Sequence, residues 1–363
     1  MARTRTRSLR WAGGLTAVTC TAALSAIGPL ARAVPEGRIH GAGRPGTVSG
    51  SYLVTLKEGT RAPSVAGKGL AERYGARISH TYGAVLNGCA VRASERQAGQ
   101  LAADPRVASV AQDTRVAPET TRKNPPSWGL DRVDQPSLPL NGRYTAPGSA
   151  GDGNGHGTHV AGTVAGSAYG VAEKAEVVSV RVLDHAGAGT TAQAIAGIDW
   201  VTRNARKPAV ANLSLGGAYN AQLDAAVRTS IASGVTHTVA AGNDGLPAGL
   251  SSPAGVRQAI TVGATDREDA RAGFSNFGSA LDLFAPGVSI TSTSSRGDRA
   301  RATRSGTSMA SPHAAGAAAL HLADHRKAMP AQVSEALVAG AVSGRVSGRG
   351  PGSPNKLLQV PGS

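Results

Sequence analysis

The sequence predicts an α/β protein in which a parallel sheet carries helices on both faces and a small α+β domain precedes it. Three observations lead to this prediction: alternating strand-like and helix-like segments over the C-terminal part, a shorter β-α-β-β-α-β pattern before it, and a glycine-rich composition with only 3% aromatic residues. Such alternation is typical of parallel sheets, and small residues favour tight turns. With 363 residues, of which 40% are hydrophobic, the chain is long enough for about two domains.

Residues 1–33 have the features of a cleavable signal peptide. Four arginines lie between positions 3 and 10, an uncharged apolar run follows, and Ala31-Arg32-Ala33 fits an A-x-A cleavage site. Glycine and proline interrupt the apolar run, which favours cleavage over a retained anchor. No other stretch is long and apolar enough to span a membrane. We therefore expect a secreted protein without membrane attachment after cleavage.

The next part of the chain divides into a linker, a small domain and a second linker. Residues 34–50 are rich in Gly, Pro and Arg, and residues 117–127 are polar and proline-rich, so both are predicted linkers. Between them, residues 51–116 predict a ferredoxin-like α+β domain whose two helices cover one face of a sheet. The predicted strands are 52–56, 78–85, 89–92 and 107–110, and the predicted helices are 65–74 and 95–103.

Residues 128–363 form the predicted main domain. Buried-type strand patterns alternate with amphipathic helix patterns, as in a parallel sheet with crossover helices. The predicted strands are 177–182, 210–214, 236–241 and 259–264, and the predicted helices are 191–202, 221–233, 309–325 and 331–341.

Charge and cysteine content narrow the class of protein. The formal net charge is +15, but five of the arginines lie in residues 1–33, and no basic run is interleaved with aromatic residues. A nucleic-acid-binding function is therefore not predicted. The only cysteines, Cys20 and Cys89, lie in segments expected to be removed, so the mature chain would have no disulfide. We expect a monomer.

Two motifs carry chemistry. Gly155-His156-Gly157-Thr158-His159 places a histidine at the start of a predicted helix, and Ser305-Gly306-Thr307-Ser308-Met309 places a serine at the start of another. Backbone N–H groups at a helix N-terminus can stabilise a developing oxyanion. Taken singly, each motif also fits a simpler role: Ser308 as a helix N-cap, or His156 and His159 as metal ligands, although no third ligand is evident.

Together these motifs resemble the subtilisin family of serine proteases, most closely its proteinase-K-like branch, over residues 51–360. The resemblance implies that Ser308 is the nucleophile and His156 the general base. It implies that Asn243, in Ala240-Ala241-Gly242-Asn243, is the oxyanion donor together with the backbone N–H of Ser308. It also implies that polypeptide substrates lie between one wall formed by Ser214, Leu215 and Gly216 and an opposite edge formed by Gly187 and Gly189.

The same resemblance gives the small domain a role. Residues 51–116 resemble the family's inhibitory propeptide, which would bind the main domain as the chain's own partner until it is cut near residues 117–124. A structural calcium ion is also implied, with the carboxylate of Asp282 and the carbonyls of Arg257 and Ala259 as ligands. The alternative for Asp282 is a turn or cap residue. No cofactor is required for the reaction.

One expected segment is absent from the sequence. The family has a central strand ending in Asp-Thr-Gly before the histidine helix, and its aspartate orients the histidine. No Asp-Thr-Gly occurs in this chain, and the connection from Tyr144 to His156 is too short to hold that strand. Asp152 is the nearest substitute. The sequence therefore predicts either an endopeptidase impaired by the loss of its aspartate, or a non-catalytic remnant that binds peptides or acts through its propeptide, unless the gap reflects a gene-model error.

Overall fold

The computed structural model describes residues 36–118, 152–297 and 299–360. The predicted signal peptide, most of the linker 117–127 and residues 128–151 lie outside the described residues. Among the described helices, none has the length and apolar character of a membrane span.

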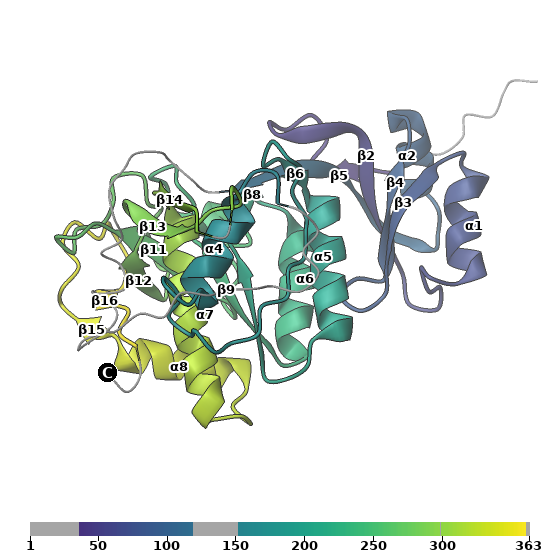
Figure 1. Ribbon diagram of the computed structural model, residues 1–363. Coiled ribbons are helices and arrows are strands. Elements are labelled where there is room, and N and C mark those ends of the chain that lie inside the picture. The colour runs from purple at the N-terminus through teal and green to yellow at the C-terminus, as the bar shows by residue number, and fades with distance from the viewer. Residues whose placement is uncertain (1–35, 119–151, 298, 361–363) are drawn as a thin grey trace, which may run out of the picture. The chain divides into compact units, whose positions relative to one another are not determined.

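The small domain has the predicted β-α-β-β-α-β order, preceded by one short strand (Figure 1). Strand β2 pairs antiparallel with both β4 and β5, and β3 pairs with β4. The elements are β1 (Ile39–His40), β2 (Thr47–Leu56), α1 (Val65–Arg73), β3 (Arg77–Tyr82), β4 (Gly88–Arg92), α2 (Glu95–Ala102) and β5 (Val107–Pro118).

Two predicted boundaries of this domain are wrong. Residues 34–50 are not only a linker, because β1 and the start of β2 lie there and pair with β5. Strand β5 also continues beyond residue 116 to Pro118, because strands of the main domain pair with its last residues. The sequence signal of both segments is weak because glycine, proline and arginine dominate them.

The two faces of the small sheet have different neighbours. Side chains of successive strand residues point to opposite faces. Tyr52 and Val54 on one face pack against Leu70 of α1 and Leu101 of α2. Leu53 on the other face joins a cluster with side chains of the main domain. The small domain therefore uses its second face to bind the main domain.

The main domain has a six-stranded sheet in the order β15-β16-β12-β11-β9-β7, whose longer strands are parallel as predicted. Helices α5 and α6 pack on one face, and α7 and α8 pack on the other. The elements are α4 (His156–Ala165), β6 (Gly189–Thr190), α5 (Thr191–Asn204), β7 (Ala209–Leu213), β8 (Leu215–Ala218), α6 (Ala221–Ala232), β9 (Val235–Ala240), the 3-10 turn η1 (Ala248–Leu250), β10 (Ser251–Ser252), β11 (Ile260–Thr265), β12 (Leu283–Pro286), β13 (Ile290–Thr293), β14 (Arg301–Arg304), α7 (Thr307–Asp324), α8 (Pro330–Gly340), β15 (Val342–Ser343) and β16 (Lys356–Leu357).

The predicted strand at residues 177–182 is wrong. Its valine-rich segment forms no strand, because no partner lies beside it within the described part of the chain. The neighbouring β7 is likewise an edge strand there. All residues of β9 and β11 are buried, whereas four of the five residues of β7 are only half-buried. A valine-rich pattern is therefore not sufficient for a strand without a neighbour.

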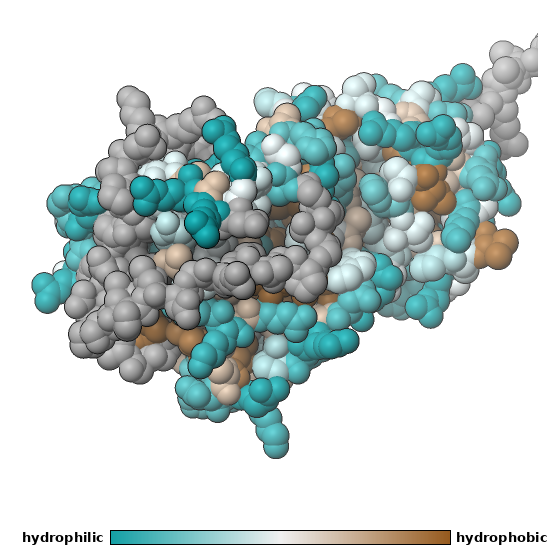
Figure 2. Space-filling model, in the orientation of Figure 1, coloured by the Kyte–Doolittle hydropathy of each residue, from teal (hydrophilic) through white to brown (hydrophobic). Residues whose placement is uncertain are grey.

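A cavity of about 870 Å³ lies between β7, residues 176–182 and helices α4, α5 and α7. The rest of the described surface is mainly hydrophilic in the view of Figure 2.

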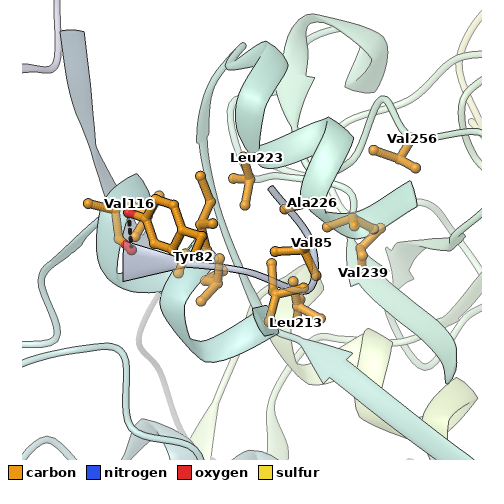
Figure 3. Close-up of a cluster of buried hydrophobic side chains, with 14 of the residues drawn as sticks. Tyr82, Val85, Val116, Leu213, Leu223, Ala226, Val239 and Val256 are labelled. Atoms are coloured by element: carbon orange, nitrogen blue, oxygen red, sulfur yellow. Dashed lines mark hydrogen bonds between the residues drawn. The ribbon is translucent and has the colours of Figure 1, made fainter. Parts of the chain in front are cut away.

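One hydrophobic cluster is formed jointly by the small domain and the main domain. Tyr82, Val85 and Val116 lie in one cluster with Leu213 and Leu223 of the main domain (Figure 3). The Tyr82 hydroxyl also donates a hydrogen bond of 3.1 Å to the carbonyl of Ala192.

Candidate active site

Ser308, the predicted nucleophile, is positioned by the turn before α7. Gly306 has φ +148°, which a residue with a side chain rarely adopts, and Ser308 follows in the first turn of α7. The fully buried Ser308 Oγ donates a 2.9 Å hydrogen bond to the carbonyl of Ser214. In return, Ser214 Oγ donates to the Ser308 carbonyl at 2.8 Å. Ser308 is thereby tied to the end of β7.

Asn243 has its amide oriented by a residue that the sequence interpretation missed. The backbone N–H and the hydroxyl of Thr307 both donate to Asn243 Oδ1, at 2.9 and 3.0 Å. Gly242 N–H donates to Thr307 Oγ1 at 3.1 Å, which orients that hydroxyl. The buried Asn243 Nδ2 has no partner among the described residues, so it is a donor ready for an oxyanion. The only sequence signal for Thr307 was its place beside Ser308.

A polar network centred on the half-buried Asn212 supports this side of the site. Asn212 Nδ2 donates to Ser214 Oγ at 2.8 Å, and Asn212 Oδ1 accepts from Ser311 at 2.7 Å and from Thr238 at 3.0 Å. The network joins β7 and β9 to the first turns of α7. A polar asparagine within a predicted buried strand was the signal for it.

His156 is held less completely. It begins α4 after Gly155, whose φ is +78°, and its side chain is almost fully buried. Its Nε2 has no hydrogen-bond partner among the described residues. Burial, and to a smaller extent the charge of Arg304 and the neighbouring His159, lower the pKa of His156 to about 3, against an opposing effect of Asp152. An imidazole this hard to protonate is a weak general base near neutral pH.

Asp152, the predicted substitute acid, caps α4. Its Oδ1 accepts from the N–H groups of Asn154 and Gly155 at 3.2 and 2.8 Å. Its Oδ2 accepts from the N–H and hydroxyl of Thr158 at 2.8 and 2.9 Å. Burial raises the pKa of Asp152, but these hydrogen bonds outweigh it and the pKa is lowered overall. None of these bonds is to His156.

The remaining histidines of the motifs are structural in this arrangement. His159 Nε2 lies 3.0 Å from the carbonyl of Ile290, and His313 Nδ1 lies 2.8 Å from the carbonyl of Met309. The described residues contain no group of three or more His, Cys, Asp or Glu side chains that could hold a metal ion.

The predicted walls of the substrate cleft lie on either side of β5. Residues Arg115 and Val116 pair antiparallel with Thr190 and Gly189 of β6. Residues Ala117 and Pro118 pair with Gly216 and Leu215 of β8. Ser214 precedes β8 and contacts Ser308, while Gly187 lies in the turn before β6, where its N–H donates to the Asp184 carbonyl at 3.0 Å. A Cβ on Gly189 would lie 2.6 Å from the Val182 carbonyl oxygen, so only glycine fits there.

Two buried carboxylates form hydrogen bonds between the small domain and α5. Neither was predicted from the sequence. Asp199 Oδ1 accepts from the three consecutive N–H groups of residues 83–85 at 2.6–3.1 Å, while Oδ2 pairs with Arg203. Asp113 Oδ1 accepts from the Ala192 N–H at 3.0 Å, at the N-terminus of α5. The signal for Asp199 was a single carboxylate on the apolar stretch of a predicted helix.

Asp282, the predicted calcium ligand, lies next to β11. Its Oδ2 accepts from the Thr261 N–H at 2.7 Å. Burial raises the pKa of Asp282 to about 6, although this hydrogen bond and the charge of Arg257 oppose the rise. Calcium accepts carboxylate oxygens as ligands, but the observed contact of this carboxylate is with a backbone N–H donor and not with the carbonyls of Arg257 and Ala259.

Comparison with known proteins gives matches over both domains. Residues 133–357 match the subtilase family, Peptidase_S8, and residues 51–118 match the peptidase inhibitor I9 family. The extracellular serine proteinase of Thermus sp. (strain Rt41A) is 42% identical over 392 positions, covering 92% of this chain and 95% of that protein. The cuticle-degrading serine protease of Arthrobotrys oligospora is 35% identical over 395 positions, covering 92% of this chain and 96% of that protein.

A solved structure agrees. The crystal structure of a cold adapted subtilisin-like serine proteinase is 43% identical, with a TM-score of 0.59, and the match covers 64% of this chain and 97% of that one. The subtilisin-like α/β fold and the I9-type propeptide domain predicted from the sequence are thereby confirmed.

Proposed function

Since this chain belongs to the subtilase family of serine peptidases, we propose that it is a secreted serine endopeptidase whose general base lacks its orienting aspartate. Ser308 Oγ attacks the carbonyl carbon of a peptide bond, and His156 accepts the hydroxyl proton and returns it to the leaving amine. Asn243 Nδ2 and the Ser308 N–H stabilise the oxyanion. Water then hydrolyses the acyl-enzyme by the same route.

One observation carries this proposal. The unpartnered Asn243 Nδ2, held by Thr307 next to Ser308, is a built oxyanion donor that a purely structural role for Asn243 would not require. A buried donor without a partner costs stability, so its presence beside Ser308 favours a role in binding a developing charge.

Four observations support the loss of the aspartate. No Asp-Thr-Gly occurs in the chain. Two relatives align over 392 and 395 positions, more than the 363 residues of this chain, which requires gaps here. Asp152 uses both oxygens to cap α4, and the 870 Å³ cavity lies beside the start of α4. In subtilisin itself, loss of the triad aspartate alone costs about 3 × 10⁴ in kcat, so a residual rate remains.

We also propose that residues 51–118 inhibit the peptidase. Because β5 pairs with both β6 and β8, it takes the place of an extended substrate. Asp199 and Asp113 add contacts away from the cleft. If cutting near residues 117–124 is slow, the secreted protein keeps this domain and has nearly its full length without residues 1–33.

A second candidate function is a peptide-binding or propeptide-inhibitor protein without catalysis. The observation that favours it is the low basicity of His156, whose Nε2 makes no hydrogen bond to a described residue.

For calcium, we propose that Asp282 and the carbonyls of Arg257 and Ala259 hold a structural ion that supplies charge compensation and plays no part in the reaction.

The test is cleavage of a synthetic peptide with the sequence of residues 112–124, followed by mass spectrometry. The secreted full chain should cut it slowly between residues 118 and 124, and Ser308→Ala should not cut it at all. An uncut peptide with folded wild-type protein, or equal cutting by Ser308→Ala, would remove the endopeptidase function and leave the binding function.

A further inference from the structure

The cavity beside β7 is bordered by two stretches of unpaired backbone. Strand β7 pairs with β9 along one edge, from Ala209 opposite Val235 to Leu213 opposite Val239. Its other edge has no partner strand in the described part of the chain, and all five of its residues line the cavity. The backbone of residues 177–180, which also lines the cavity, makes no hydrogen bond to any described residue. Because Val178 and Ser179 are exposed, their unpaired N–H and C=O groups can pair with water or with a further strand.

We propose that this cavity is an acceptor slot in which an extended apolar segment of another polypeptide adds to β7 as a parallel β-strand. One added strand would supply hydrogen-bond partners to both unpaired edges at once, as in strand-addition complexes. Its binding does not depend on whether Ser308 is active.

The walls of the slot define the side chains of the occupant. Helix α5 contributes Ile198 and Val201, and α4 and α7 contribute Val164 and Ala319. Because α5 and α7 cover opposite faces of the sheet, a strand in the slot would be enclosed on both faces. Such strands are continuous runs of valine, isoleucine and leucine rather than alternating polar and apolar residues. The occupant is therefore a run of five or six aliphatic residues, matching the five residues of β7.

Two arginines at one end of the slot indicate which end of the bound strand would carry an acidic residue. A parallel strand would begin beside Ala209 and end beside Leu213. Arg206 lines the slot just before β7 begins, and Arg326 lines it just after α7 ends. An acidic residue preceding the aliphatic run would lie near these cations.

The volume alone is also suitable for a small apolar ligand, since such sites span about 300–1,000 Å³. A ligand without backbone groups would leave the N–H and C=O groups of residues 177–180 and β7 unpaired. A polypeptide strand would pair with these groups, whereas a small apolar ligand would not. An experiment that detects this pairing therefore distinguishes the two occupants.

The test uses the full secreted chain and an acetylated peptide of two glutamates followed by six alternating valine and isoleucine residues. The matched control is the same peptide with N-methyl groups on alternate residues, which removes backbone donors and keeps the side chains. The signal is the emission of Trp200, which lines the slot and is 42% exposed. Trp200→Phe shows which part of the emission change comes from this residue.

We expect a saturable blue shift of Trp200 emission and slower hydrogen exchange at residues 177–182 and 209–213. The N-methylated peptide should bind at least tenfold more weakly. Val178→Pro should also weaken binding of the parent peptide without unfolding the protein, because Val178 is 61% exposed and its N–H makes no hydrogen bond to a described residue. Val178→Thr, which keeps the N–H, should bind as the parent does.

Three results would overturn the slot. Equal binding of the parent and N-methylated peptides would show apolar capture without strand pairing. Binding without slower exchange at residues 209–213 would place the peptide elsewhere. A dimer of the protein that the peptide disperses would assign the edge to a second copy of this chain.

Discussion

The Ser308 side and the His156 side of the site differ in how completely their side chains are held. Around Ser308, each polar group of Asn243, Thr307 and Ser214 that positions the site has a defined partner, and the exception is the Nδ2 donor that faces substrate chemistry. Around His156, the ring is buried beside a cation, Arg304, and Nε2 has no partner among the described residues. The difference teaches that oxyanion stabilisation and general-base catalysis are built on separate elements and can be lost separately.

The largest expected effect is a loss of stability at low pH, caused by His156 and three other buried histidines. Burial lowers the pKa of His159, His237 and His313 to about 4 and that of His156 to about 3. Unfolded histidine has a pKa near 6.5, so the unfolded state binds more protons and stability falls as the pH falls from about 6.5 to 4. At pH 5 the loss is about 2 kcal/mol per histidine.

Urea unfolding at pH 7.5 and pH 5 measures this loss. His237→Gln, which removes one titrating group that lies away from Ser308, is the matched variant and should lose less stability between the two pH values. An unfolding free energy that stays constant between them would contradict the buried neutral state of these rings.

The next prediction separates a helix cap from a substitute catalytic acid. Asp152→Ala removes four hydrogen bonds at the start of α4 and should lower the free energy of unfolding by about 2 kcal/mol. The rate at which a fluorophosphonate labels Ser308 should change less than about twofold per folded molecule. A loss of rate of 10³-fold or more at unchanged stability would make Asp152 the partner of His156.

A third change tests the Ser308 side. Thr307→Val removes the hydroxyl that donates to Asn243 Oδ1 and accepts from Gly242. The amide of Asn243 then loses one of two contacts that orient it, and the labelling rate should fall about tenfold, or about 1.4 kcal/mol. Thr307→Ser, which keeps the hydroxyl, should retain the rate. Equal rates for the two variants would show that the backbone contact alone orients Asn243.

The smallest predicted effect concerns Arg304. Its charge lowers the pKa of His156, so Arg304→Gln should raise that pKa and increase the labelling rate at neutral pH a few-fold. Arg304→Lys is the charge-conserving control. A rate that falls in Arg304→Gln and is kept in Arg304→Lys would mean that the cation aids the reaction.

The sequence was sufficient for the fold class. It also singled out the three residues that we propose to act on the peptide bond, because Ser308, His156 and Asn243 lie in motifs with unusual local composition. It was insufficient where the outcome depends on distant partners. Residues 177–182 have a strand-like pattern but no neighbouring strand within the described residues, and Thr307 and Asp199 acquire their roles only through contacts with Asn243 and residues 83–85. Such contacts leave no periodic or compositional signal.

The most direct test of the central claim compares the labelling of Ser308 by a fluorophosphonate in His156→Ala and Asn243→Ala. We predict that Asn243→Ala lowers the labelling rate by about 10²–10³, as loss of an oxyanion donor does. We predict that His156→Ala lowers it by less than about tenfold, because the unassisted His156 contributes little as a base. A loss near 10⁶ for His156→Ala, about the size found when the histidine of a complete triad is removed, would show that His156 has an acidic partner and contradict the account.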